Sequence, residues 1–150
     1  MDGASADHEL GFPYRFRWTL GIWKRLYLDS GPVVEVPAGD EALARGRYLV
    51  EGPGHCGECH TPRNPALAMD KAAWLSGAPL PEGEGKASNL LPSSDGIGDW
   101  SADDIAYYLE AGVDPDFDVV GGPMVAVQEN MAKLSAADRE AIAAYLKALP

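Results

Sequence analysis

Five consecutive residues in the middle of the chain, Cys56-Gly57-Glu58-Cys59-His60, form the pattern Cys-x-x-Cys-His. Two thiols at this spacing can add across the two vinyl groups of one porphyrin, which attaches a haem covalently in a single orientation. The histidine directly after the second thiol then lies beneath the iron and supplies an imidazole nitrogen. The motif therefore predicts one covalent haem c, attached through Cys56 and Cys59, with His60 as an iron ligand.

Two other kinds of site also use a Cys-x-x-Cys pair. A thiol redox pair of thioredoxin type is found in a βαβ context, which this sequence does not show. A structural zinc site needs four ligands, and only His55 and His8 would be extra candidates, with no second cysteine pair. A helix-forming segment before the motif and a long irregular segment after it also favour haem over both.

A sixth iron ligand is expected far downstream, in the loop before the last helix. Met124 lies there, behind a Gly121-Gly122-Pro123 turn that restricts its backbone, and it is the favoured axial ligand. Met69 follows the motif closely, and Met131 lies where core packing is the commoner use of methionine. Met131, His8 and an open sixth position remain as alternatives. The methionines of the chain are Met1, Met69, Met124 and Met131.

Three segments are predicted to be helices with recognisable start signals. Asp40 can cap a helix that runs from Glu41 to Val50 and stops at Gly52-Pro53-Gly54. Gly46 inside this helix costs helix propensity, which close approach of Tyr145 from the last helix would compensate. The segment Ser101-Ala102-Asp103-Asp104 resembles a capping box before a second helix that ends at Gly112.

The clearest helix is the last one, which Ser135 caps. Its apolar stripe consists of Ile142, Tyr145, Leu146 and Leu149.

Between the first two helices, residues 61–100 are rich in proline and glycine and show little periodicity. A loop of that length inside a compact domain is usually organised by another component, and a large buried ligand would do so.

Residues 1–38 are predicted to form an N-terminal aromatic arm in front of a haem domain at residues 39–150. The arm has too many large apolar side chains for a disordered tail. It is expected to pack on the flank of its own domain, on a partner protein, or at a membrane surface, which its basic residues suit. The large apolar residues are Phe12, Tyr14, Phe16, Trp18, Leu20, Ile22, Trp23, Leu26, Tyr27 and Leu28.

The chain of 150 residues has a formal net charge of −11, from 23 acidic and 12 basic side chains. Such a surface repels polyanions, which argues against nucleic acid as a partner. No Lys or Arg occurs between Ala87 and Ala132, where the acidic residues serve either solubility or docking. These residues are Asp95, Asp99, Asp103, Asp104, Glu110, Asp114, Asp116, Asp118 and Glu129.

No apolar run is long enough to span a bilayer, because basic residues interrupt the longest candidate, Phe12 to Leu28. The start at Met1-Asp2-Gly3 shows no secretory signal and is expected for a mature form or for a domain of a longer product. The two cysteines cannot form a disulfide framework.

Several stretches resemble the class I cytochrome c domains in the cytochrome subunits of bacterial membrane-bound alcohol, aldehyde and gluconate dehydrogenases. Those subunits usually carry three haem motifs, whereas this chain has one. The aromatic segment from Gly11 to Leu26 also resembles one that precedes their haem domains. In order, the matching stretches are 45–49, 56–63, 88–92, 96–100, 119–125 and 141–150.

The resemblance implies an all-α fold, the class I cytochrome c fold with the haem edge exposed at one face. It implies that Pro62 and Ile97 pack on the porphyrin. By the same resemblance, Arg63, Asn89 and Trp100 are candidates for hydrogen bonds near the haem or its propionates, and Trp100 could equally belong to the core. A periplasmic location follows, since haem is attached covalently on that side of the bacterial membrane; membrane association is left open.

The sequence thus predicts an electron carrier, not an enzyme, that moves single electrons from a dehydrogenase donor to a cytochrome or oxidase acceptor. Residues 11–28 are the predicted docking segment, for a partner or a membrane surface. One alternative is a haem enzyme or small-ligand-binding haem protein with an open sixth position. Another is a fixed relay inside a larger dehydrogenase, docked through the arm.

Overall fold

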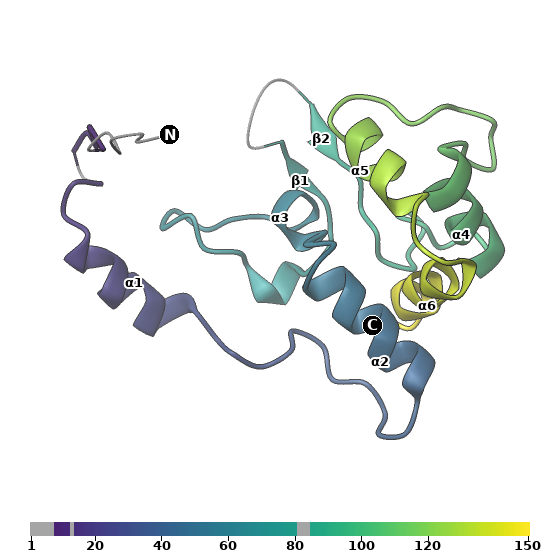
Figure 1. Ribbon diagram of the computed structural model, residues 1–150, viewed down its shortest axis with the longest axis horizontal. Coiled ribbons are helices and arrows are strands. Elements are labelled where there is room, and N and C mark those ends of the chain that lie inside the picture. Colours follow the sequence, from purple (N-terminus) through teal and green to yellow (C-terminus); the bar gives the residue numbers. More distant parts are fainter. Residues whose placement is uncertain (1–7, 13, 81–84) are drawn as a thin grey trace, which may run out of the picture. The chain divides into compact units, whose positions relative to one another are not determined.

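The computed structural model describes residues 8–12, 14–80 and 85–150. Within these residues the secondary structure is almost entirely helical, which confirms the expected all-α fold (Figure 1). The chain divides into two compact units, with the boundary between Gly31 and Pro32. The elements are α1 (Trp18–Tyr27) in the first unit and, in the second, α2 (Glu41–Glu51), α3 (Gly57–His60), a 3-10 turn (Lys71–Ala73), β1 (Ala78–Pro79), β2 (Lys86–Ala87), α4 (Ala102–Ala111), α5 (Met124–Met131) and α6 (Ala136–Lys147).

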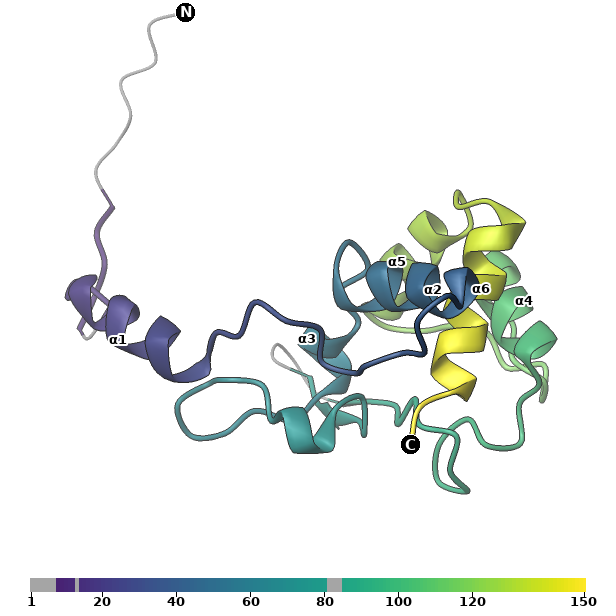
Figure 2. The same ribbon diagram turned by 90° about the horizontal axis from the view of Figure 1, so that it is seen from below.

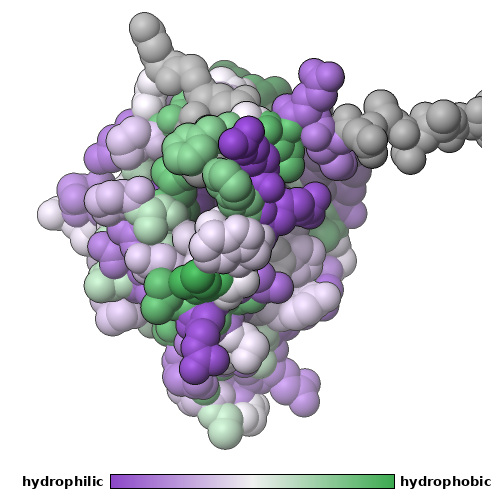
Figure 3. All heavy atoms as spheres, turned by 90° about the vertical axis from the view of Figure 1, so that its left-hand side faces the viewer, coloured by the Kyte–Doolittle hydropathy of each residue, from purple (hydrophilic) through white to green (hydrophobic). Residues whose placement is uncertain are grey.

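The first unit contains α1, none of whose residues is buried. Lys24 and Arg25 lie in its last turn, and its large exposed side chains include Trp18 and Leu26. Figure 3 draws one face of the molecule, on which hydrophobic and hydrophilic side chains are intermixed. The sequence predicted the aromatic character of this segment but not its helix.

The second unit begins with an extended stretch that packs on the helical core. Val33 and Val34 contact the buried cluster, and their backbone N–H groups donate to the Glu51 carboxylate at 2.8 and 3.1 Å. Tyr145 donates to the same carboxylate at 2.7 Å. The division into an arm at residues 1–38 and a domain at residues 39–150 remains a prediction.

The core forms where α2 and α4 pack against α6, an arrangement that Figure 2 shows from below. A methyl group at Gly46 would lie 2.0 Å from the Ala141 carbonyl oxygen and 2.7 Å from the Tyr145 Cβ. The helices therefore touch at Gly46, as its place inside a helix predicted. Tyr145 is only 1% exposed at this crossing.

The three predicted helices are confirmed together with their caps. Asp40 accepts from the Leu43 N–H at 2.9 Å at the start of α2. Ser101 and Asp104 form a complete capping box at the start of α4, and Gly112 ends that helix in the left-handed conformation, with φ of 71°. Ser135 accepts from the Asp138 N–H at 3.2 Å at the start of α6.

Helix α5 was not predicted, because Met124 was expected in a loop. The structure makes Met124 the first residue of this helix, directly after Pro123. The fixed φ of proline suits a helix start, and Gly122, with φ of 58°, turns the chain into it. The segment has little apolar periodicity, and Gln128 is its only buried residue.

Candidate functional site

The Cys-x-x-Cys-His motif forms a single helical turn. Cys56 immediately precedes α3, in which Cys59 and His60 follow, and the His60 N–H donates to the Cys56 carbonyl at 3.0 Å. Both cysteines are free thiols and partly exposed. The two thiols and the imidazole thus lie on one helical turn, and their roles toward a haem remain predictions.

The imidazole of His60 is oriented by a backbone carbonyl. Its Nδ1 lies 2.7 Å from the Ser88 oxygen, and because a carbonyl can only accept, Nδ1 carries the proton. The other nitrogen, Nε2, is then left with its lone pair. Burial lowers the pKa of His60, which favours the neutral ring. A carbonyl-bound, neutral imidazole is the usual form of a histidine that ligates a metal.

A small hairpin holds the Ser88 carbonyl in place. β1 and β2 pair in antiparallel fashion, with Ala78 opposite Ala87, just before Ser88. Gly77 starts the hairpin with φ of 83°, and its N–H donates to the His60 carbonyl at 2.8 Å. Part of the irregular segment after the motif is therefore organised by contacts to the motif helix.

Gly57, between the two cysteines, lies against an aromatic ring. A methyl group at this position would be 2.2 Å from Cζ3 of Trp74, so only glycine lets the ring pack on the motif helix. Trp74 is buried in the same core cluster as Leu75. The next residue after the motif, Thr61, accepts from the Leu75 N–H at 3.0 Å and fixes this segment beside α3.

The thiol chemistry differs from that of a redox pair. Burial raises the pKa of Cys56 to about 11, so this thiol stays protonated at neutral pH. Thioredoxin-type cysteines show the opposite shift, toward the thiolate. Among the residues that the structure describes, no group of three or more His, Cys, Asp or Glu side chains is placed to hold a metal ion. The raised pKa of Cys56 therefore does not fit a thiol redox pair.

The candidate sixth ligands lie in different environments. Met69 and Met131 pack against the buried core, whereas Met124 is a half-buried residue at the first position of α5. His8 lies in the first unit. His55 is exposed, with φ of 36°. Met124 as the axial ligand stays a prediction, supported by the fact that Met69 and Met131 already pack against the core.

Arg63 and Asn89 have partners close to the motif. Arg63 forms an ion pair with Glu58, inside the motif, and donates to the Leu67 carbonyl at 2.8 Å. Asn89 accepts from the Leu91 N–H at 2.9 Å and donates to the Ser93 hydroxyl at 3.2 Å. Both residues therefore organise the loops around the motif, and their predicted contacts with a haem remain predictions.

Pro62, Ile97 and Trp100 all lie in the second unit. The Pro62 carbonyl accepts from the Asp70 N–H at 2.8 Å. Ile97 belongs to the buried core, and Trp100 packs edge-to-face on Tyr108 with ring centroids 5.4 Å apart. Trp100 thus has the core contact considered as its alternative role, and packing on a porphyrin remains a prediction for Pro62 and Ile97.

Two contributions to the site were missed in the sequence. Ser88 acts through its backbone carbonyl, which every residue carries, so no residue type could indicate it. Trp74 packs on Gly57, and the glycine between the thiols was the available signal. A covalently attached haem fits the groups that result: two thiols that can react with its vinyl groups, and a neutral imidazole with Nε2 available to the iron.

The chain is similar to cytochrome c proteins. It is 50% identical over 149 residues to a "Diheme cytochrome c-type" of Cereibacter sphaeroides, covering 99% of this chain and 49% of that protein. It is 41% identical to a "Gluconate 2-dehydrogenase cytochrome c subunit" of Pantoea cypripedii, and the match covers 97% of this chain and 35% of that protein. It is 39% identical to a "Fructose dehydrogenase cytochrome subunit" of Gluconobacter japonicus, and the match covers 100% of this chain and 31% of that protein. No family model matches the chain.

The chain spans about half the length of the first of these relatives and about a third of the other two. Its sequence resembles the cytochrome c domains of dehydrogenase cytochrome subunits, as the matching stretches indicated. Because the similarity covers nearly the whole chain, it includes the aromatic segment as well as the helical unit.

Proposed function

We propose that this chain carries one covalent haem c and transfers single electrons between a dehydrogenase and a downstream acceptor. Cys56 and Cys59 attach the haem, His60 is the proximal ligand and Met124 the sixth. The observation that carries the proposal is the 2.7 Å hydrogen bond between His60 Nδ1 and the Ser88 carbonyl, which leaves Nε2 for iron. The similarity to cytochrome c subunits supports the same conclusion.

The haem supplies an iron that accepts and returns one electron. The protein residues fix its geometry. The Ser88 carbonyl holds the His60 ring in one tautomer and one orientation. Gly57, which has no side chain, lets the buried Trp74 ring pack directly against the motif helix. Rigid ligation of this kind keeps the reorganisation that accompanies electron transfer small, and Met/His ligation raises the reduction potential relative to bis-His.

A single Cys-x-x-Cys-His motif supports one haem for this chain. The similar protein of Cereibacter sphaeroides is described as diheme, and the chain covers 49% of it. One haem in about half of a two-haem protein agrees with one motif in this chain.

The donor that we propose is a dehydrogenase, because two of the similar proteins are named as subunits of gluconate and fructose dehydrogenases. The acceptor is then a cytochrome or an oxidase, and the location is the periplasm, where covalent haem attachment takes place. No helix in the described ranges combines the length and the apolar character needed to span a bilayer.

Residues 11–28 are the docking segment in this proposal. Helix α1 has no buried residue, and its exposed side chains include Trp18, Ile22 and Leu26. An apolar surface of this kind, next to Lys24 and Arg25, suits contact with a dehydrogenase or cytochrome partner. We expect deletion of residues 1–30 to leave the haem spectrum intact and to weaken association with the dehydrogenase in a pull-down. Unchanged association, binding to lipid vesicles instead, or loss of the haem fold would each contradict it.

The test of haem attachment is the mass and the spectrum of the full chain after maturation in a host that attaches haem c. We expect the mass of the protein plus one haem, and loss of covalent haem when Cys56 and Cys59 are both replaced by Ala. Colourless protein of unmodified mass would overturn the proposal.

The test of the sixth ligand compares three methionine variants. We expect the sulfur-to-iron charge-transfer band of the oxidised protein to disappear in Met124→Ala and to persist in Met69→Leu and Met131→Leu. Persistence in Met124→Ala would show that another residue is the ligand. High-spin iron in the unmodified chain would favour an open position and the alternative function of small-ligand binding.

A further inference from the structure

Helix α5 presents Met124 on the face that it turns toward the rest of the second unit. Gln128 follows Met124 by four residues and Met131 by seven, a spacing that puts all three on one side of a helix. Gln128 is 8% exposed, and Met131 packs against the core. The first residue of that inward face is therefore Met124.

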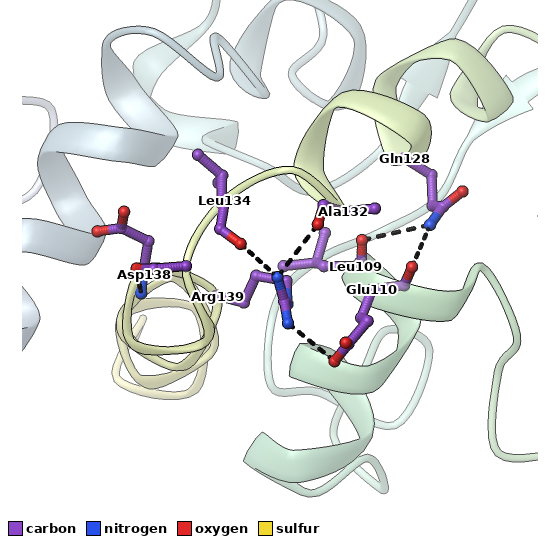
Figure 4. Close-up of polar contacts among 8 residues, drawn as sticks. Leu109, Glu110, Gln128, Ala132, Leu134, Asp138 and Arg139 are labelled. Atoms are coloured by element: carbon purple, nitrogen blue, oxygen red, sulfur yellow. Dashed lines mark hydrogen bonds and ion pairs between the residues drawn. The ribbon is translucent and has the colours of Figure 1, made fainter.

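The fully buried contact on the inward face of α5 is polar. Gln128 is the only buried residue of this helix, and Met131 adds a partly buried apolar contact with the core. The Gln128 side-chain amide donates to the Glu110 carbonyl at 2.8 Å and to the Leu109 carbonyl at 3.3 Å (Figure 4). Both carbonyls lie in the last turn of α4, where they have no partner within the helix.

The turn at the end of α4 confines this amide. A methyl group at Gly112 would lie 3.1 Å from the Gln128 side-chain oxygen, and φ at Gly112 is +71°. The amide therefore occupies a close-fitting position against the α4 terminus, and a side chain of different length or charge could not reproduce its two bonds.

Arg139 of α6 secures the other end of α5. Its guanidinium donates to the Leu134 carbonyl at 2.5 Å and to the Ala132 carbonyl at 3.4 Å, just beyond the end of α5. It also forms an ion pair with the Glu110 carboxylate at 2.8 Å (Figure 4). Arg139 is only 6% exposed, so its bonds to the two carbonyls are shielded from bulk water, whereas the Glu110 carboxylate lies at the surface.

Glu110 joins the two contacts, because its backbone carbonyl receives Gln128 and its carboxylate receives Arg139. We propose that Gln128 and Arg139 are positioning residues that hold Met124 in place as the sixth iron ligand. The inference rests on the proposed function, since it assumes that Met124 is the ligand. It adds that this polar network determines how readily another ligand displaces the methionine.

The experiment is a titration of the oxidised haem-containing chain with imidazole, followed by loss of the sulfur-to-iron band. The first variant, Gln128→Glu, keeps the shape of the side chain but replaces the amide donor by a carboxylate. The second variant, Arg139→Lys, keeps the positive charge but removes the guanidinium group that donates to several acceptors at once. We expect the apparent Kd for imidazole to fall about tenfold in each, the effect of roughly one lost hydrogen bond.

The matched control is Tyr145→Phe, which removes the 2.7 Å bond to Glu51 between α6 and α2, a bond that involves none of Gln128, Arg139 and Glu110. We expect it to lower the urea midpoint of unfolding about as much as Gln128→Glu and to leave the Kd for imidazole within about twofold of that of the unmodified chain. If the Kd for imidazole depended only on global stability, it would fall in Tyr145→Phe as much as in the other two variants.

Two outcomes would overturn the inference in distinguishable ways. If the band depends on Met124 but Gln128→Glu shifts the Kd no more than Tyr145→Phe does, the network is merely structural and the proposed function stands. If the band is absent from the unmodified chain, or survives in Met124→Ala, the ligand assignment itself fails and the inference fails with it.

Discussion

Gly46 illustrates how a single residue determines the packing of two helices. It costs helix propensity inside α2, yet it lets α2 approach α6 so closely that a methyl group would meet the Ala141 carbonyl oxygen at 2.0 Å. The close approach brings Tyr145 within 2.7 Å of Glu51, whose carboxylate also receives the N–H groups of Val33 and Val34. One glycine thereby permits an apolar crossing and a polar contact at the same place.

Gly46→Ala is expected to lower the free energy of unfolding by about 1–3 kcal/mol, because overpacking forces the two helices apart. Urea unfolding of the haem-containing chain measures it. The control is Gly21→Ala in α1, where a methyl group meets nothing within 4 Å and should have little effect or raise helix stability. Equal stability of Gly46→Ala and the unmodified chain would contradict the close crossing.

The ion pair of Arg45 with Asp138, at 2.7 Å, gives a pH-dependent contribution to stability. The hydrogen bond from Arg45 lowers the pKa of Asp138 in the folded chain. Stabilisation by a carboxylate with a lowered pKa is complete above its unfolded pKa and is lost as the pH falls through the folded value. We expect Arg45→Gln to be less stable than the unmodified chain at pH 7.

The difference between Arg45→Gln and the unmodified chain should shrink as the pH falls below the ordinary range of an aspartate. Urea unfolding at a series of pH values measures it. Asp138→Asn serves as the companion variant, since it removes the titrating group and should make the effect of Arg45→Gln independent of pH. A constant difference across the acidic range would contradict the assignment.

At the scale of elements, helix starts are set by short polar motifs. In α4, the Ser101 hydroxyl accepts from the Asp104 N–H at 3.1 Å, while the Asp104 carboxylate accepts from the Ser101 N–H at 2.8 Å. Hydrogen bonds from Ser101 lower the pKa of Asp104, as expected for a carboxylate at a helix start. These local interactions fix where the helix begins.

Ser101→Ala is expected to lower the free energy of unfolding by about 1 kcal/mol, a typical effect for loss of a helix cap. Thermal unfolding followed by circular dichroism measures it. Ser94→Ala, at an exposed position outside the helices, is the matched control and should change little. An equal effect of the two substitutions would show that the cap contributes nothing specific.

For the whole molecule, the dominant property is negative charge. Between Ala87 and Ala132 the chain has acidic side chains and no Lys or Arg. Asp114 organises part of this surface, since its carboxylate accepts from the N–H groups of Asp116 and Asp118 at 3.0 and 2.9 Å. Asp116 and Asp118 themselves are exposed, and so are available to attract a basic partner.

Electron transfer to a basic redox protein should slow as salt rises, because exposed charges are screened beyond about 8 Å at physiological ionic strength. Stopped-flow kinetics at increasing salt measures it. The double variant Asp116→Asn/Asp118→Asn should show a shallower dependence, and a small uncharged oxidant should show almost none. A flat response of the unmodified chain would mean that this surface serves solubility only.

Local sequence determined the three capped helices, because a capping side chain and the backbone that it caps lie within a few residues of each other, and the glycine inside α2 indicated a close contact with another element. Tertiary structure alone decided that the Ser88 carbonyl meets His60 and that Gln128 and Arg139 converge on Glu110. His60 and Gln128 are bound through backbone carbonyls, which no side-chain pattern marks, and Arg139 and Glu110 lie on different helices, so only the packed fold could bring these residues together.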